Sequence, residues 1–136
     1  MKNLLKKALY LSILTGVFIV YSQNLMAQNA WNAPAKAIGV ANPIKSSPAS
    51  IAAGKSLWTR HCQSCHGKTG MGDGSKAAQL KTEPGDFTIA KFQGQTDGSI
   101  FYKTLEGRED MPSFKKKIPD TDDIWNLVNF IRTLKK

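Results

Sequence analysis

The sequence predicts an all-α domain in which three main helices are joined by substantial loops. Three segments place apolar residues at helical spacing, no stretch shows sustained strand alternation, and segments containing glycine or proline separate the helices. The chain has 136 residues and a formal net charge of +9. A chain of this length is expected to form one domain.

Residues 1–27 have the organisation of a secretory signal peptide. Three lysines precede an uncharged apolar run at 8–21, and cleavage is expected after Ala27. The run is shorter than the roughly 20 residues that span a bilayer. Leu25 is large for its place three residues before the cut, so an uncleaved membrane anchor is the alternative. In either case the remainder is expected to be exported to the periplasm.

Residues 28–49 are predicted to be a Pro/Ala-rich linker or a strap lying over the domain. This stretch has three prolines, no acidic residue and no helical or strand period. Trp31 within it is a candidate for docking onto the domain. The compact domain is therefore expected to cover residues 50–136, a size that usually needs reinforcement by a cofactor or a disulfide.

The first helix is predicted to start with Ser50 as its N-cap and to run into the segment RHCQSCHG at 60–67. The second begins at Thr96 or Asp97 and ends at Gly107. Its packed side is expected to contain Ile100, Phe101 and Leu105.

The third helix has the clearest pattern. Asp120 or Thr121 is its expected cap, and acidic residues in the first turn complement the positive end of the helix dipole. Its apolar stripe consists of Ile124, Leu127, Val128, Ile131 and Leu134.

Both cysteines and both histidines of the chain lie between residues 61 and 66. On a helical turn Cys62, Cys65 and His66 are at i, i+3 and i+4 and project from one face. Two thiols can then add to the two vinyl groups of a haem while the imidazole reaches the iron. This is the physical content of C-x-x-C-H as a signal for attachment of one haem c.

Other uses of these residues fit the sequence less well. A thioredoxin-like dithiol needs a strand-to-helix junction, and no strands are evident. A zinc site would have to use two adjacent His/Cys pairs that point in different directions. A disulfide between Cys62 and Cys65 would close a very small loop and stabilise little.

The second axial iron ligand is predicted to be Met111. His61 lies on the same side of the ring as His66, and Met71 lies in the glycine-rich loop that follows His66. Met111 comes after the second helix, and Pro112 stiffens an extended loop that can present its sulfur from the opposite side. The predicted iron ligands are therefore His66 and Met111.

These motifs resemble the class I cytochrome c family over residues 50–136. The match rests on GKSLWTRHCQSCHG, TGMGDG, MPSF and the closing helix IWNLVNFIRTL. The resemblance implies the cytochrome c fold, with helices and loops wrapped around one covalent haem. It also implies a crossing of the first and last helices, with Gly54 and Trp58 facing Leu127 and Phe130. Pro84 is the candidate whose carbonyl orients the proximal imidazole.

The function expected from this site is transfer of single electrons between redox proteins, without enzymatic chemistry. Removal of residues 1–27 lowers the net charge from +9 to +6. That basic charge is interpreted as a docking field for acidic redox partners, with Lys115, Lys116 and Lys117 rimming the haem edge. The alternative is a solvated surface with no dedicated partner. Nucleic acid is not expected as a partner, and membrane contact is expected only through partners or an uncleaved anchor.

Two other functions stay open at this point. Instead of a free monomeric carrier, the chain could be the electron-accepting subunit of a periplasmic dehydrogenase or reductase complex. A haem sensor for small ligands would require Met111 to be displaced easily.

Overall fold

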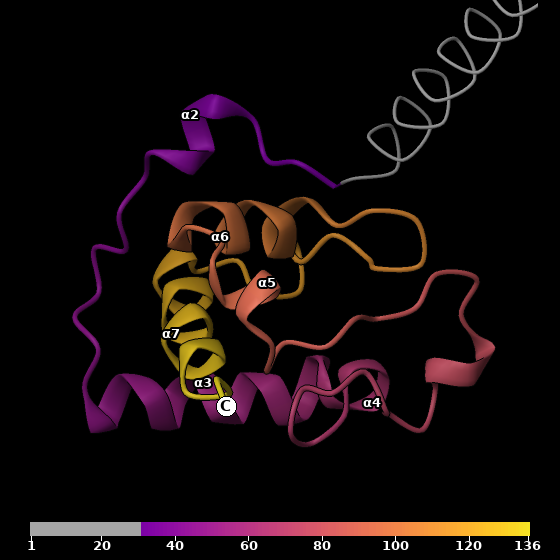
Figure 1. Cartoon of the computed structure of the whole chain (residues 1–136). Coiled ribbons are helices and arrows are strands. Elements are labelled where there is room, and N and C mark those ends of the chain that lie inside the picture. Colours follow the sequence, from indigo (N-terminus) through magenta and orange to yellow (C-terminus); the bar gives the residue numbers. More distant parts are fainter. Residues whose placement is uncertain (1–30) are drawn as a thin grey trace, which may run out of the picture. The chain divides into compact units, whose positions relative to one another are not determined.

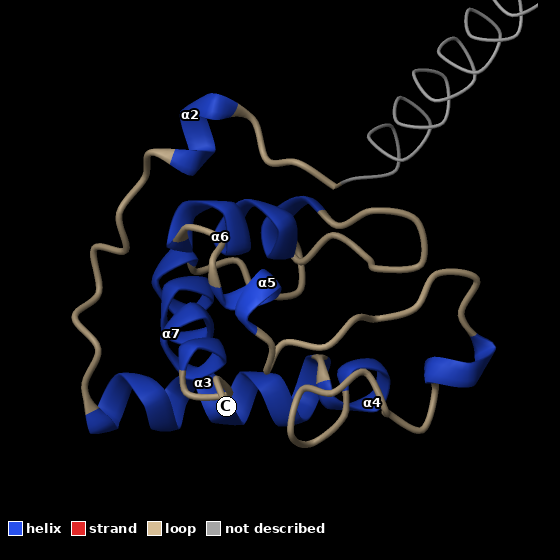
Figure 2. Ribbon diagram, viewed as in Figure 1, coloured by secondary structure: helices blue, strands red, loops and turns tan. Residues whose placement is uncertain are grey.

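The computed structural model describes residues 31–136, and the expected signal peptide lies outside the described residues. Residues Ala33–Lys136 form one compact unit. Within the described part of the chain every regular element is a helix (Figure 2). The elements are α2 (Ala35–Ile38), α3 (Pro48–His61), α4 (Gln63–His66), a 3-10 turn (Ala77–Gln79), α5 (Ala90–Gln93), α6 (Asp97–Glu106) and α7 (Thr121–Arg132). None of the helices in residues 31–136 is long and apolar enough to cross a membrane.

The first main helix begins three residues earlier than its sequence predicts. Ser47, not Ser50, is the N-cap of α3, and its hydroxyl accepts a bond from the Ser50 N–H. Pro48 occupies the first helical position, where a missing N–H has no cost. The prediction of Ser50 as the cap was wrong because its side chain serves a tertiary contact. The Ser50 hydroxyl is buried against α7, where it donates to the Asn126 side chain at 2.6 Å.

The second main helix has its predicted boundaries, and the third begins where the sequence predicts. Thr96 caps α6 through its hydroxyl, and Gly107 ends the helix with φ 69°. Asp120 caps α7, whose first turn holds Asp122 and Asp123 at the positive end of the dipole.

The apolar stripe of α7 is the centre of the core. Ile124, Leu127, Val128 and Ile131 are almost fully buried, whereas Leu134, just past the helix end, is partly buried. Helices α3 and α7 cross and make the most extensive contact between elements, with α6 against α7 as well (Figure 1).

The crossing of α3 and α7 has no room for a side chain at Gly54. A Cβ there would overlap the Asn126 carbonyl and lie 2.8 Å from the Phe130 Cβ. Trp58, one turn further along α3, packs against the Phe130 ring at 5.8 Å between centroids. The expected contact of Gly54 and Trp58 with Phe130 is therefore present, and Asn126 takes part in it in addition. Leu127, the other expected partner, is buried in the core.

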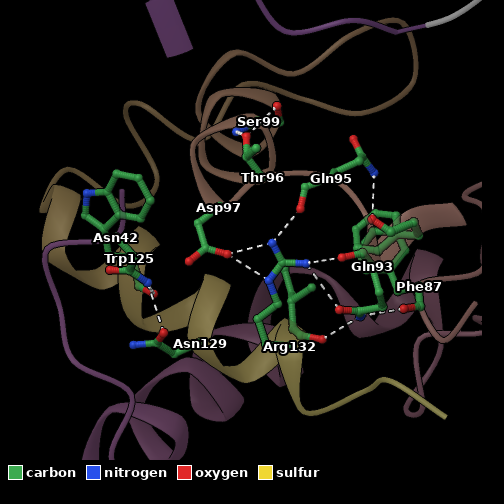
Figure 3. A network of polar contacts seen from close by, with 12 residues as sticks. Asn42, Phe87, Gln93, Gln95, Thr96, Asp97, Ser99, Trp125, Asn129 and Arg132 are labelled. Atoms are coloured by element: carbon green, nitrogen blue, oxygen red, sulfur yellow. Dashed lines mark hydrogen bonds and ion pairs between the residues drawn. The ribbon is translucent and has the colours of Figure 1, made fainter. Parts of the chain in front are cut away.

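Residues 33–47, which precede α3, contain one helical turn, α2, which the sequence pattern does not predict. A polar network joins the extended part of this segment to α7 (Figure 3). Asn42 donates to the Asn129 side chain at 2.9 Å and to the Trp125 carbonyl at 3.2 Å. Asn129 in turn donates to the Ile44 carbonyl at 3.0 Å. Because Asn129 is buried, these bonds hold the segment against the helix bundle.

A second network closes the other end of α7 (Figure 3). The Arg132 guanidinium pairs with Asp97 at the start of α6, with N–O distances of 2.6 and 2.7 Å. It also donates to the backbone carbonyls of Gln93 and Gln95, at 2.8 and 2.6 Å. One side chain thus ties α5, α6 and α7 together.

Candidate haem-binding site

The junction of α3 and α4 places the two cysteines and His66 on one turn. Cys62 ends α3 and starts α4. Its carbonyl accepts bonds from the backbone N–H groups of Cys65, at 3.1 Å, and of His66, at 2.9 Å. The helical turn that the C-x-x-C-H spacing predicts is therefore present, and all three side chains come from the same short segment.

Both cysteines are free thiols. Cys62 is buried, and burial raises its pKa to about 12, with Cys65 adding to the shift. Redox dithiols depend on a cysteine whose pKa is lowered, because the thiolate is the nucleophile. The environment of Cys62 has the opposite effect, which is unlike a thioredoxin-type site.

His66 is held in its neutral form by an apolar setting. Burial lowers its pKa to about 4, and the backbone carbonyl of Pro84 opposes part of this shift. Two aromatic rings border the imidazole, with centroids 4.6 Å away for Phe87 and 5.8 Å away for Trp58. A neutral imidazole is the form that binds a metal.

The Nδ1 atom of His66 is buried and has no hydrogen-bond partner within the described residues. The Pro84 carbonyl lies close enough to raise the His66 pKa, although not in a geometry that makes a full hydrogen bond. Because Nδ1 is the buried ring nitrogen, Nε2 is the atom that would be left for a ligand. Pro84 is thus located where the resemblance implies.

Trp58 is almost completely buried, at 1% exposure, and connects the helix crossing to this turn. Its indole N–H donates to the Gly67 carbonyl at 3.0 Å, directly after His66. The same ring contacts Phe87 edge-on at 5.5 Å. Trp58 therefore supports the backbone that carries the imidazole.

His61 has different surroundings from His66. Its ring packs edge-on against Phe114 at 6.0 Å. Its pKa is lowered by partial burial and by the nearby charges of Arg60 and Lys117. Within residues 31–136 no three His, Cys, Asp or Glu side chains gather as they would around a metal ion. The separate environments of the two imidazoles do not resemble a shared zinc site.

The glycine-rich loop folds back beneath α4. Its backbone bonds include Gly72 N–H to the His66 carbonyl at 2.9 Å and Gly74 N–H to the Cys65 carbonyl at 3.2 Å. Met71 in this loop is exposed, and its sulfur lies 3.4 Å from the Lys136 ammonium. Met71 thus faces solvent.

Met111 lies at the end of a tight turn after α6. It pairs with Arg108 through two backbone bonds, of 2.8 and 2.9 Å, and packs partly buried against the core. Gly107 makes this turn possible, since a Cβ there would come within 2.5 Å of the Met111 carbonyl oxygen. Pro112 follows and is exposed.

Sequence reasoning missed several residues around the site. Phe87 borders His66 but lies in an irregular loop, where no periodicity marks it. Asp110 and Glu109 contact residues 81 and 82, a long-range pairing with no local signal. Asn126 contributes to the crossing of α3 and α7 through its backbone carbonyl, which any residue type would supply.

The residues present fit a covalently attached haem. Two free thiols and a neutral imidazole share one turn, and the Nδ1 atom of the imidazole is buried. Aromatic side chains of Trp58 and Phe87 border the imidazole. This donor set matches the chemistry of C-x-x-C-H attachment.

The all-α fold and this donor set define a class I c-type cytochrome. A family model described as cytochrome c oxidase, cbb3-type, subunit III matches residues 49–131. That match covers more than half of the chain, and the chain belongs to this family. It is a cytochrome c domain, which binds haem c and carries electrons.

Two solved structures are similar to this chain. One is described as the Kuenenia stuttgartiensis reducing HAO-like protein complex Kustc0457/Kustc0458, with 29% identity, 73% of this chain covered and a TM-score of 0.64. This chain spans about half of that one, at 49% of its length. The other is the KustC0563 c-type cytochrome, with 29% identity and a TM-score of 0.54. It is covered over 98% of its length by 61% of this chain. A search of curated proteins gave no match.

Proposed function

We propose that this protein is an exported mono-haem cytochrome c that passes single electrons between redox proteins and is not an enzyme. The observation that carries the proposal is the single turn holding Cys62, Cys65 and a neutral, partly buried His66. Cys62 and Cys65 would hold one haem c covalently, and His66 and Met111 would be the axial ligands. Bound there, the haem supplies a one-electron couple.

The protein's own residues favour electron transfer over substrate chemistry. His66 and Met111 together would fill both axial positions, so that no position is left for a substrate. The neutral thioether of Met111 would favour the reduced state and a positive potential. Burial of His66 among Trp58 and Phe87 restricts movement of the imidazole, which suits a site that must change little between oxidation states.

The visible spectrum of the exported protein tests the proposal. A sharp low-spin α band on reduction, with the weak red charge-transfer band of methionine–iron ligation when oxidised, is expected. Haem bands without the charge-transfer band would overturn Met111 as the ligand and favour a sensor, which carbon monoxide binding would support. No haem, from a host able to attach it, would overturn the proposal.

A basic face beside Cys62 is the proposed docking surface for an acidic partner. Arg60 and Lys117 lie near enough to His61 to lower its pKa, so their charges gather next to Cys62. Lys116 and Lys117 are exposed, whereas Lys115 is already paired with Glu106 at 2.7 Å. Lys116 and Lys117 therefore offer more free charge to a partner than Lys115 does.

Replacing all three lysines by glutamine tests this surface. The dependence of the electron-transfer rate on ionic strength should weaken, because the long-range attraction that salt screens is reduced. The matched control replaces Lys36, Lys45 and Lys55, three exposed lysines elsewhere. An equal effect of the two triple variants would show that only net charge affects the rate. It would contradict the proposed docking surface.

A second candidate function is an electron-accepting subunit of a larger periplasmic complex. The similar chain from the HAO-like protein complex favours this candidate. Residues 33–49 offer a surface for such a partner, since Ile38 and Val40 are exposed apolar side chains. Co-purification of a second polypeptide, lost on changing both residues to serine, would support the subunit assignment. Recovery of the chain alone would support the free carrier.

A further inference from the structure

Asp110 connects two loops that lie about thirty residues apart in the sequence. One carboxylate oxygen of Asp110 accepts bonds from the backbone N–H groups of Lys81, at 2.7 Å, and Thr82, at 3.0 Å. The Thr82 hydroxyl donates to the neighbouring Glu109 carboxylate at 2.6 Å. We call these three bonds the loop latch.

The loop latch joins a loop that lies next to His66 to the turn that carries Met111. On one side, Thr82 lies in the loop that continues through Pro84 to Phe87, whose ring borders the His66 imidazole at 4.6 Å between centroids. On the other side, Asp110 directly precedes Met111. The latch is therefore a direct connection between the loop that orients His66 and the loop that carries Met111.

The turn at Glu109 aims both carboxylates at the other loop. Glu109 has φ 54° and is the one non-glycine residue with positive φ in residues 31–136. This conformation costs a residue with a Cβ about 1 kcal/mol. The turn closes through the paired bonds between Arg108 and Met111, so the strain is offset by contacts on both of its sides.

The loop of Met111 is also anchored at its far end. The Ser113 hydroxyl donates to the Leu105 carbonyl at 2.7 Å, and the Phe114 N–H donates to the same carbonyl at 3.2 Å. Residues 113 and 114 are thus bound to the end of α6. Met111 lies between this anchor and the latch, so loss of the latch removes one of the contacts that support its position.

The latch depends on Asp110 specifically and not on acidic charge in general. Two backbone N–H groups bonded to one carboxylate oxygen form charge-assisted hydrogen bonds, which are stronger than bonds between neutral groups. Glu83 lies in the same loop, is exposed and makes no contact comparable to those of Asp110. Exposure weakens bonds of this kind, so the effect of the latch is expected to be local rather than global.

We propose that Asp110, together with Glu109, is a positioning residue that ties the 80–84 loop to the Met111 turn and so stabilises the methionine–iron bond. This inference rests on the proposed function, because it concerns how firmly Met111 would be held as a ligand of the haem iron. Asp110 touches neither the imidazole nor the sulfur and acts through the backbone of the two loops.

The test uses the full-length, haem-loaded protein and its Asp110→Ala variant. Imidazole is titrated into the oxidised protein, and loss of the red charge-transfer band reports displacement of Met111. The variant should lose the band at an imidazole concentration about tenfold lower, corresponding to about 1.4 kcal/mol. Asp110→Asn keeps one acceptor oxygen and should fall between the variant and the parent. The matched control, Glu83→Ala, should stay within about twofold of the parent.

A second measurement separates the latch from the ligand assignment. Amide hydrogen exchange at Lys81, Thr82 and Met111 reports loop coupling whether or not the sulfur binds iron. Faster exchange at all three in Asp110→Ala, but not in Glu83→Ala, is expected. If the parent lacks the charge-transfer band, the Met111 assignment fails, and the claim about the methionine–iron bond fails with it. If the band is present and Asp110→Ala responds like Glu83→Ala, only the latch inference is overturned.

Discussion

Gly54 on α3 and Asn126 on α7 lie so close together that a Cβ at Gly54 would overlap the Asn126 carbonyl oxygen. Only a residue without a Cβ permits this approach, which sets the crossing of the two longest helices within residues 31–136. The crossing in turn places Trp58, one turn along α3, against Phe130 and His66. Packing at Gly54 thus determines where the turn of Cys62, Cys65 and His66 lies relative to the core.

Gly54→Ala is expected to destabilise the protein by about 1–3 kcal/mol, because the new methyl forces the helices apart. The free energy of unfolding, measured by denaturant titration, checks this. Gly39→Ala is the control, since a Cβ at Gly39 meets nothing within 4 Å and its φ of −78° suits any residue. Equal stability of the two variants would contradict the close crossing.

Trp58→Phe is expected to lower the free energy of unfolding by about 1–3 kcal/mol beyond the loss of ring size, because the buried Gly67 carbonyl loses its partner. Trp125→Phe removes a similar volume from another buried tryptophan, which stacks on Phe101 at 4.0 Å. The Trp125 indole makes no hydrogen bond comparable to that of Trp58. A cost for Trp58→Phe no greater than that of Trp125→Phe would show that the indole bond contributes nothing.

Cys62→Ala and Cys65→Ala should each leave one thiol to attach the haem. Each variant is expected to carry a single thioether, and the double variant none, because each thiol forms one bond. Mass spectrometry of the denatured chain and haem staining on a denaturing gel measure this attachment. Covalent haem in the double variant would rule out these cysteines as the anchors.

Arg132→Gln should lower the free energy of unfolding by about 1–3 kcal/mol, because two backbone carbonyls and Asp97 lose a charged donor together. The ion pair is partly exposed, so most of this loss is assigned to the carbonyl bonds. Lys135→Gln is the charge-matched control, since Lys135 is exposed. A loss of equal size in both variants would indicate a general effect of charge and not the loss of the Arg132 hydrogen bonds.

Lys117→Gln should raise the pKa of His61, because the Lys117 charge is one of the causes that lower it. Burial and Arg60 remain, so the pKa should stay below its usual value. Titration of the His61 ring by NMR measures the shift. Lys116→Gln is the control, and an identical response to both variants would place Lys117 no nearer to His61 than Lys116 is.

Residues close in sequence determined much of the site and of the secondary structure. The turn of Cys62, Cys65 and His66 follows from their spacing, because i, i+3 and i+4 share a helix face. The limits of α6 and the start of α7 follow from Thr96, Gly107 and Asp120, whose capping chemistry is local. The buried stripe of α7 likewise follows from its period.

Tertiary structure alone decided the features that join distant segments. Ser50 is a good capping residue, yet it bonds to Asn126 while Ser47 caps α3, because burial against α7 gives its hydroxyl another partner. The latch of Asp110 on residues 81 and 82 joins two loops without any periodic pattern. Any residue other than proline at positions 81 and 82 would supply the backbone N–H groups that Asp110 binds. The residue types at these positions therefore do not indicate the contact. The sequence therefore determines which residues can hold a haem, and the packing of loops determines how firmly they are held.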